Sequence, residues 1–124
     1  MKMNESAENY LETILVLSEQ LPVVRSIDIA NEMNFKKSSI SVAMKNLRTN
    51  GYIKVNDTGF ITLTETGKEI AERIYERHEF FRKWLIALGV DEQIASEDAC
   101  RMEHYMSPDS FKAIKEYITK EMNL

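Results

Sequence analysis

The order of the predicted elements between residues 26 and 63 limits the possible folds of this chain more than any other feature. Ser26 is a typical N-cap residue for a short helix, and a tight connection leads to a second helix expected over residues 38–49. Asn50-Gly51 predicts the end of this second helix, because glycine adopts the left-handed backbone of a helix C-terminus without strain. A pair of β-like runs then predicts a hairpin.

The hairpin is predicted from Tyr52–Val55 and Phe60–Leu63, which lie on either side of the turn residues 56–59. A longer helix, expected to end just before Pro22, precedes the two short helices. This order is typical of a winged helix-turn-helix, in which the second short helix enters the DNA major groove and the hairpin contacts the backbone. We therefore expect residues 1–64 to form a DNA-binding domain.

The second short helix has one face suited to DNA. Ile40 and Leu47 belong to its apolar side, whereas Val42 and Lys45 lie opposite. Small and basic side chains can approach base edges and phosphates closely, and Val42 can contact a thymine methyl group. The alternative is an ordinary amphipathic helix with a solvated polar side, but the adjoining hairpin favours DNA. The predicted DNA-contacting residues are Lys36, Lys37, Ser38, Ser39, Ser41, Val42, Lys45 and Lys54.

The net charge of −4 argues against nucleic-acid binding only until it is divided along the chain. Residues 1–64 carry seven Lys/Arg and seven Asp/Glu, whereas residues 65–124 carry nine and thirteen. Residues 25–55 hold six basic and two acidic side chains, a local excess of +4. Such an excess can face a phosphate backbone.

Residues 65–124 predict an all-helical domain, so the fold class is mainly α. Thr66 begins a capping-box pattern, and the apolar stripe after it runs to about Leu88 with His78 on its inward side. Asp91 is expected to cap the next helix, and Ser107-Pro108 to open the last one. A lone cysteine cannot form an internal disulfide, and no leader or membrane span is visible, which favours the cytoplasm.

Cys100, Glu103 and His104 stand at spacings i, i+3 and i+4, so on a helix they would share one face. The chain has one cysteine and two histidines, and the other histidine, His78, lies on a helix that can pack against this face. Taken singly, each of these residues is more often structural or solvated. Together they predict a metal site.

The chain resembles the metal-dependent repressors of the diphtheria-toxin-repressor and manganese-transport-regulator family. The resemblance covers essentially all 124 residues, and its anchors are Glu8–Glu12, Arg77–Glu79 and Cys100–Ser107. It implies a winged-helix domain followed by a helical dimerisation domain, here residues 65–124. The SH3-like third domain of many iron-sensing members is expected to be absent, as in the manganese branch. The resemblance nominates six metal ligands: Asn9, Glu12, His78, Cys100, Glu103 and His104.

The nominated ligand set departs from both branches of the family. At Asn9 the manganese branch has aspartate and the iron branch methionine; at Cys100 they have glutamate and cysteine. Arg82 and Ser96 occupy the positions of a glutamate and a histidine in a second iron-type site, so a single-metal site is a serious alternative. Carboxylates and imidazoles suit Fe²⁺ or Mn²⁺, while the thiolate moves preference toward Fe²⁺, Co²⁺ or Zn²⁺.

These observations predict a cytoplasmic homodimer, not an enzyme, that binds palindromic double-stranded DNA when a divalent metal joins its first helix to the dimerisation helices. Repression of iron or manganese uptake genes is implied by the resemblance alone. Two alternatives stay open: a winged-helix regulator that responds to an organic ligand or to oxidation of Cys100, and a small metalloenzyme. The enzyme is the weaker, because no His-Glu-x-x-His pattern occurs.

Overall fold

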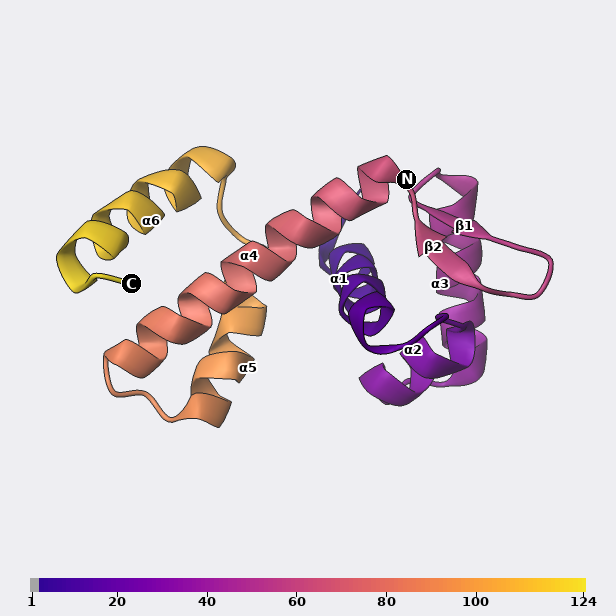
Figure 1. Cartoon of the computed structure of the whole chain (residues 1–124), viewed down its shortest axis with the longest axis horizontal. Helices are drawn as coiled ribbons and strands as arrows, with labels where there is room; N and C mark the ends of the chain where they lie inside the picture. The colour runs from indigo at the N-terminus through magenta and orange to yellow at the C-terminus, as the bar shows by residue number, and fades with distance from the viewer. Residues whose placement is uncertain (1–2) are drawn as a thin grey trace. The chain divides into compact units, whose positions relative to one another are not determined.

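The computed structural model of the chain describes residues 3–124, which contain six helices and a two-stranded sheet (Figure 1). The mainly α fold class is thereby confirmed. The elements in chain order are α1 (Glu5–Gln20), α2 (Ser26–Met33), α3 (Lys37–Thr49), β1 (Ile53–Val55), β2 (Ile61–Leu63), α4 (Glu65–Ala87), α5 (Glu92–Met102) and α6 (Pro108–Met122).

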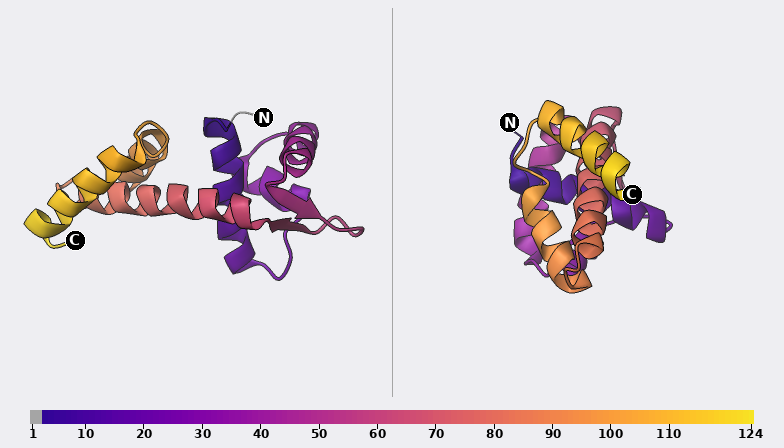
Figure 2. Two further views of the ribbon diagram at one scale, coloured as in Figure 1. Left: turned by 90° about the horizontal axis from the view of Figure 1, so that it is seen from above. Right: turned by 90° about the vertical axis from the view of Figure 1, so that its left-hand side faces the viewer.

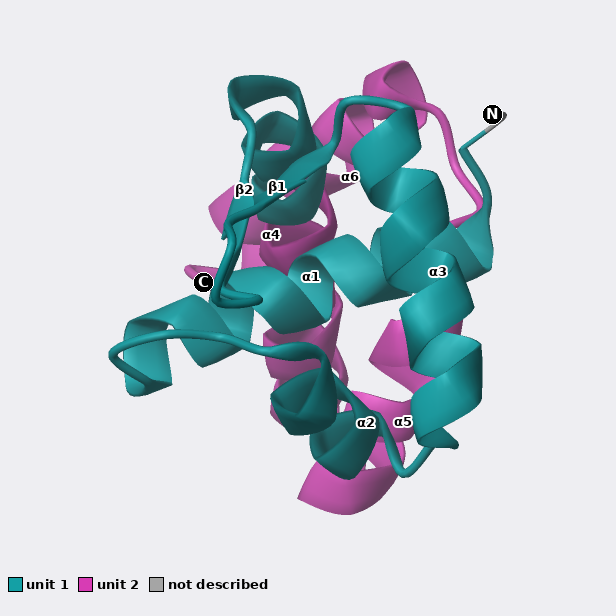
Figure 3. Cartoon of the chain, turned by 90° about the vertical axis from the view of Figure 1, so that its right-hand side faces the viewer, with its two compact units in different colours: residues 1–72 teal, residues 73–124 magenta. Residues whose placement is uncertain are grey.

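Contacts between residues divide the chain into two compact units, residues 1–72 and 73–124 (Figure 3). The division falls inside α4, which Figure 2 shows as one continuous helix. The sequence-based boundary after residue 64 falls just before the first residue of α4.

Unit 1 is a three-helix core closed by the hairpin. Leu11 and Ile14 of α1, Ile29 of α2 and Leu47 of α3 are all buried in it. The hairpin strands are antiparallel, with Ile61 of β2 opposite the last residue of β1. An isolated bridge between Val24 and Ile61 ties the segment after α1 to the outer edge of β2. The predicted order of helix, turn, helix and hairpin is present, with strand ends within one residue of those expected.

Two predicted helix caps were wrong by one or two positions. The N-cap of α2 is Arg25 and not Ser26, because the carboxylate of Asp28 accepts the backbone N–H of Arg25 at 2.8 Å. In α4, Thr64 rather than Thr66 supplies the capping oxygen, which accepts the N–H of Gly67 at 3.2 Å. Asp91 and Ser107 do cap α5 and α6 as expected.

The first turn of α4 is anchored to the start of the hairpin. The hydroxyl of Thr64 donates to the carbonyl of Gly51 at 2.7 Å, and its N–H donates to the carbonyl of Tyr52 at 3.1 Å. Gly67 lies so close to Tyr52 that an added Cβ would stand 2.0 Å from this carbonyl oxygen. Only a residue without a Cβ allows the approach.

Unit 2 consists of the remainder of α4 together with α5 and α6. Its core is aromatic: Phe81 and Ala99 are fully buried, and the ring of Phe111 meets those of Phe80 and Phe81 at centroid distances of 5.7 and 5.6 Å. Leu88 was expected on the inward stripe of α4 but is 57% exposed. The helix ends one residue earlier, so Leu88 falls in the turn before α5.

Candidate functional site

The outward face of α3 has the composition expected of a DNA-reading surface. Ile40, Met44 and Leu47 are buried, whereas Val42 is 62% exposed and Lys45 is exposed. The structure places all the predicted DNA-contacting residues at the surface of unit 1: Lys36, Lys37, Ser38, Ser39, Ser41, Val42, Lys45 and Lys54. Their role in DNA binding stays a prediction.

A cleft of about 200 Å³ lies between the start of α2, the flank of α3 and the end of β1. Ser26, Ser41, Lys45 and Arg48 line it, with Met44 and Val55 as its apolar part. Two hydroxyls, two cations and a helix N-terminus suit a phosphate group. Ser26 and Arg48 were not among the predicted contacts. Arg48 does belong to the basic stretch at residues 25–55, and this local charge could have indicated it as a DNA contact.

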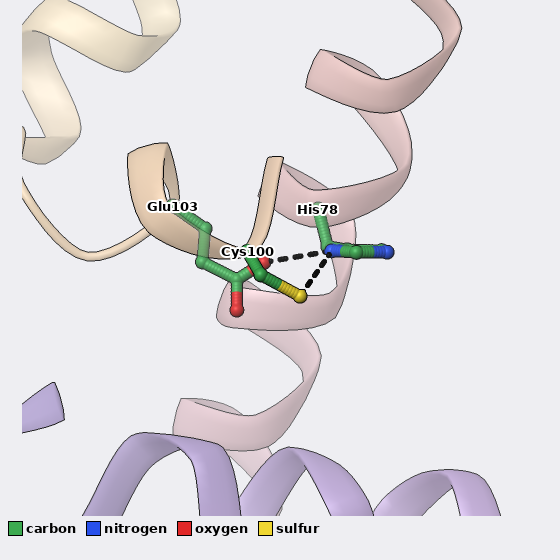
Figure 4. A group of neighbouring side chains, drawn as sticks. All are labelled: His78, Cys100 and Glu103. Carbon is green, nitrogen blue, oxygen red and sulfur yellow. Dashed lines mark hydrogen bonds and ion pairs between the residues drawn. The ribbon is translucent and has the colours of Figure 1, made fainter. Parts of the chain in front are cut away.

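Three donor groups converge in unit 2 (Figure 4). His78 comes from α4 and Cys100 from α5, while Glu103 is the C-cap residue of α5. Nδ1 of His78 lies 3.0 Å from Oε2 of Glu103 and 3.6 Å from Sγ of Cys100, and one donor atom from each residue lies within 4.8 Å of the others. Donors on opposite sides of one cation at about 2.1–2.3 Å are separated by a similar distance.

His104 is also close to this group but not for the reason expected. The helix ends at Met102, so His104 lies in the following turn instead of on the face of α5. Its Nε2 stands 3.2 Å from Oε1 of Glu103, and both side chains are almost completely buried. A carboxylate between two imidazoles therefore joins the two histidines of the chain.

The chemistry of the donors fits a divalent cation. Glu103 is fully buried, and its Oε1 has the 3.2 Å ion-pair contact with Nε2 of His104 but no well-aligned hydrogen bond among the described residues. A buried carboxylate oxygen in this condition is costly unless a cation or another donor satisfies it. Carboxylate and imidazole suit divalent first-row metals such as Mn²⁺ and Fe²⁺, and the thiolate moves the preference toward Fe²⁺ and later metals.

The pKa values of this group show how strongly its members interact. Hydrogen bonding to Cys100, and next to Glu103, raises the pKa of His78 from 6.5 to about 10 despite its partial burial. Burial would raise the pKa of Glu103, but contacts with His104 and His78 outweigh burial and lower it. Near neutral pH the metal-free group therefore holds an imidazolium beside a carboxylate.

Asn9 and Glu12, the remaining two nominated ligands, lie one turn apart on α1 in unit 1. Their place in a metal site stays a prediction. At the position of the second iron-type site, Arg82 donates to the carboxylate of Glu92 at 3.2 Å, and Ser96 is half-buried on α5. A guanidinium engaged with a carboxylate is a poor neighbour for a further cation.

None of the described helices is long and apolar enough to cross a membrane.

The winged helix-turn-helix fold defines a class of DNA-binding proteins. Two family profiles match the chain: iron dependent repressor, N-terminal DNA binding domain, over residues 2–59, and iron dependent repressor, metal binding and dimerisation domain, over residues 64–121. Together they cover most of the sequence. The chain belongs to this family of metal-dependent transcriptional repressors, which confirms the family expected from the sequence.

Individual relatives agree with the family profiles. The chain is 35% identical over 120 residues to an uncharacterised HTH-type transcriptional regulator of Methanocaldococcus jannaschii, covering 95% of this chain and 96% of the relative. It is 31% identical over 113 residues to the HTH-type transcriptional regulator MntR of Bacillus subtilis, covering 91% and 80%. The solved structure of the manganese regulator SloR matches with a TM-score of 0.77 and 25% identity over 99% of this chain. The chain spans 55% of the SloR chain.

Proposed function

We propose that this chain represses genes for iron or manganese uptake when a divalent cation binds at His78, Cys100, Glu103 and His104. One observation carries the proposal: donor atoms of His78, Cys100 and Glu103 lie within 4.8 Å of one another in a chain that also contains a winged helix-turn-helix. Asn9 and Glu12 are included as further ligands because the family resemblance nominates them.

The proposed ligand residues bring negatively charged groups and nitrogen donors together at one site. Bound there, a divalent cation would neutralise the carboxylate and thiolate and join α4 to the end of α5. His78 must first lose its proton, since only the neutral imidazole ligates a metal. The thiolate of Cys100 favours Fe²⁺ over Mn²⁺, with Co²⁺ and Zn²⁺ as laboratory substitutes.

The DNA-binding residues of the proposal lie at the start of α2, on α3 with its N-cap residue, and in the hairpin. Val42 and Ser38 would meet base edges, while Lys45, Arg48 and Ser26 would hold a backbone phosphate in the cleft of unit 1. Two copies of α3 in a homodimer would read the two halves of a palindromic operator.

The dimer itself is expected through unit 2, whose family profile is that of a dimerisation domain. Apolar side chains are exposed around the turn between α4 and α5: Ile86 is 38%, Leu88 57% and Ile94 52% exposed. Clustered exposed apolar groups mark protein interfaces. Burial of this patch against a second copy would give the homodimer a hydrophobic contact.

Fluorescence anisotropy with palindromic DNA from upstream of a metal-transporter gene tests the function. The chain is titrated anaerobically with EDTA present and then with Fe²⁺, Mn²⁺, Co²⁺ or Zn²⁺, and a scrambled duplex of equal length serves as control. We expect tight, sequence-specific binding only with metal. Equal binding with EDTA would indicate a regulator controlled by an organic ligand or by Cys100 oxidation, and no binding at all would overturn the DNA-binding role.

A further inference from the structure

We propose that Arg77 is a positioning residue for the metal site: its guanidinium fixes the backbone after α5 so that Glu103 and His104 present their donor atoms before any cation binds. The inference rests on the proposed metal-dependent function. It concerns a residue that contributes no ligand atom of its own.

Two consecutive residues of α4 hold Glu103 from opposite ends. The ring of His78 contacts the carboxylate, with Nδ1 3.0 Å from Oε2. Arg77 contacts the backbone of the same residue, because its Nη1 donates to the carbonyl of Glu103 at 3.2 Å. Both the position of the main chain and the direction of the side chain are thus determined from one helix.

The backbone at this point needs such a contact. Residues 103–106 form the turn between α5 and α6, outside regular structure. Carbonyls at a helix C-terminus have no partner within the helix, and a cation there interacts favourably with the helix dipole. Nη1 of Arg77 also donates to the carbonyl of Met106 at 2.8 Å, so one guanidinium spans the turn that contains His104.

The burial of Arg77 separates this arrangement from an incidental surface contact. Only 4% of the residue is exposed, and its guanidinium carbon lies 5.2 Å from the ring centroid of Phe111 in the first turn of α6. Burying a guanidinium costs free energy unless hydrogen bonds and nearby π-electrons compensate. The contacts therefore link α4, the end of α5 and the start of α6 at the residues next to the ligands.

A purely structural role predicts a different result from a positioning role. If Arg77 only tied helices together, its replacement would lower the melting temperature and leave the bound metal unchanged. If it positions Glu103 and His104, its replacement changes the ligand set while His78 and Cys100, on α4 and α5, still bind. Cobalt distinguishes these cases, because thiolate ligation and overall coordination geometry give separate absorption bands.

The test compares Arg77→Met, which removes charge and donors, with Arg77→Lys, which keeps the charge but loses the planar, multi-donor geometry. Arg101→Met is the matched control, since Arg101 is exposed on α5 and pairs only with Asp98 among the contacts described for it. Anaerobic Co²⁺ titrations of the full chain record the thiolate-to-cobalt band and the d–d bands. Far-ultraviolet circular dichroism checks the fold.

We expect Co²⁺ affinity to fall about 10-fold to 100-fold in Arg77→Met, the range typical of residues that orient metal ligands. In Arg77→Met the d–d bands should shift while the thiolate band persists. The Co²⁺ affinity of Arg77→Lys should lie between those of Arg77→Met and the wild type, and Arg101→Met should match the wild type. A folded Arg77→Met with wild-type affinity and d–d bands would overturn the positioning role alone. If Arg77→Met does not fold, wild-type affinity and d–d bands in Arg77→Lys would overturn that role instead. A wild-type chain that binds neither Co²⁺ nor Mn²⁺ would overturn the proposed function and this inference with it.

Discussion

Nδ1 of His78 lies 3.0 Å from Oε2 of Glu103, although the two residues are 25 positions apart in the sequence. The contact joins the middle of α4 to the end of α5 and carries opposite charges, because the pKa of His78 is raised to about 10 and that of Glu103 is lowered. A protonated histidine thus occupies the place beside the carboxylate that a bound cation would take. In the metal-free chain this charged contact links α4 to the residue that ends α5.

Glu103→Ala should abolish metal-dependent DNA binding while leaving the fold intact, and His104→Ala should do the same. Each change removes one ligand from a metal site that has few, so metal affinity should fall by more than about 100-fold. This loss is larger than that typical of residues that only orient the ligands. Isothermal titration with Mn²⁺ and anisotropy with operator DNA measure the two effects. Glu97→Ala is the control, because Glu97 is an exposed carboxylate on α5, the helix that ends just before Glu103. An unchanged metal response in both variants would refute the site.

The metal-free chain should lose stability as the pH rises from about 6.5 to 10. The folded pKa of His78 is raised from 6.5 to about 10, so its stabilising charge is fully present below 6.5 and is lost as pH rises through 10. The lowered pKa of Glu103 acts in the opposite direction, and its contribution is lost only in acid, below its usual pKa of 4.5. Melting temperatures in EDTA across this range measure the loss.

Cys100→Ser provides the control for this pH dependence. Hydrogen bonding to Cys100 is the largest cause of the raised pKa of His78, so the variant should lose less stability between pH 7 and pH 10 than the wild type. Identical pH profiles would mean that the contact between His78 and Cys100 does not set the titration. Metal affinity, unlike the stability of the metal-free chain, should increase as the pH rises, by about tenfold per pH unit for each proton displaced.

Much of the fold could be predicted because helical period, turn residues and proline are local signals. The sequence alone could not predict which threonine caps α4, since Thr64 and Thr66 have similar local context. The choice depends on the contact of Thr64 with Gly51, thirteen residues away. The role proposed for Arg77 was missed for a related reason: the acceptors are backbone carbonyls, which every residue has, so no pattern of side chains reveals them.

The sequence predicted which residues form the candidate metal site more readily than how those residues are arranged. The spacing of Cys100, Glu103 and His104 suggested a single helical face, yet α5 ends before Glu103. In the turn that follows, Nε2 of His104 nevertheless lies 3.2 Å from Oε1 of its neighbour Glu103, a contact that helical periodicity does not predict. The scarcity of cysteine and histidine was the more informative signal.

Lys45→Ala should weaken DNA binding without altering metal affinity. Lys45 is exposed on α3 and lines the cleft proposed to hold a phosphate. Loss of one phosphate contact should reduce the slope of log affinity against log salt concentration by about 0.9 for each copy that binds. Lys68→Ala is the control of equal charge, since Lys68 lies on α4 and pairs with Glu72. Undiminished operator affinity with an unchanged salt slope would remove Lys45 from the DNA-binding surface.

Gly67→Ala should destabilise the chain, although alanine is the better helix former by about 1 kcal/mol. The new Cβ would stand 2.0 Å from the carbonyl oxygen of Tyr52, so α4 or the hairpin must move and the contacts of Thr64 must weaken. We expect a net loss of about 1–3 kcal/mol in the free energy of unfolding, the range for inserting a methyl group into a filled space. Urea titration followed by circular dichroism measures it, and Thr66→Ala, an exposed change in the same helical turn, should stay within about 0.5 kcal/mol of the wild type. A Gly67→Ala variant as stable as Thr66→Ala would show that α4 can separate from the hairpin at no cost.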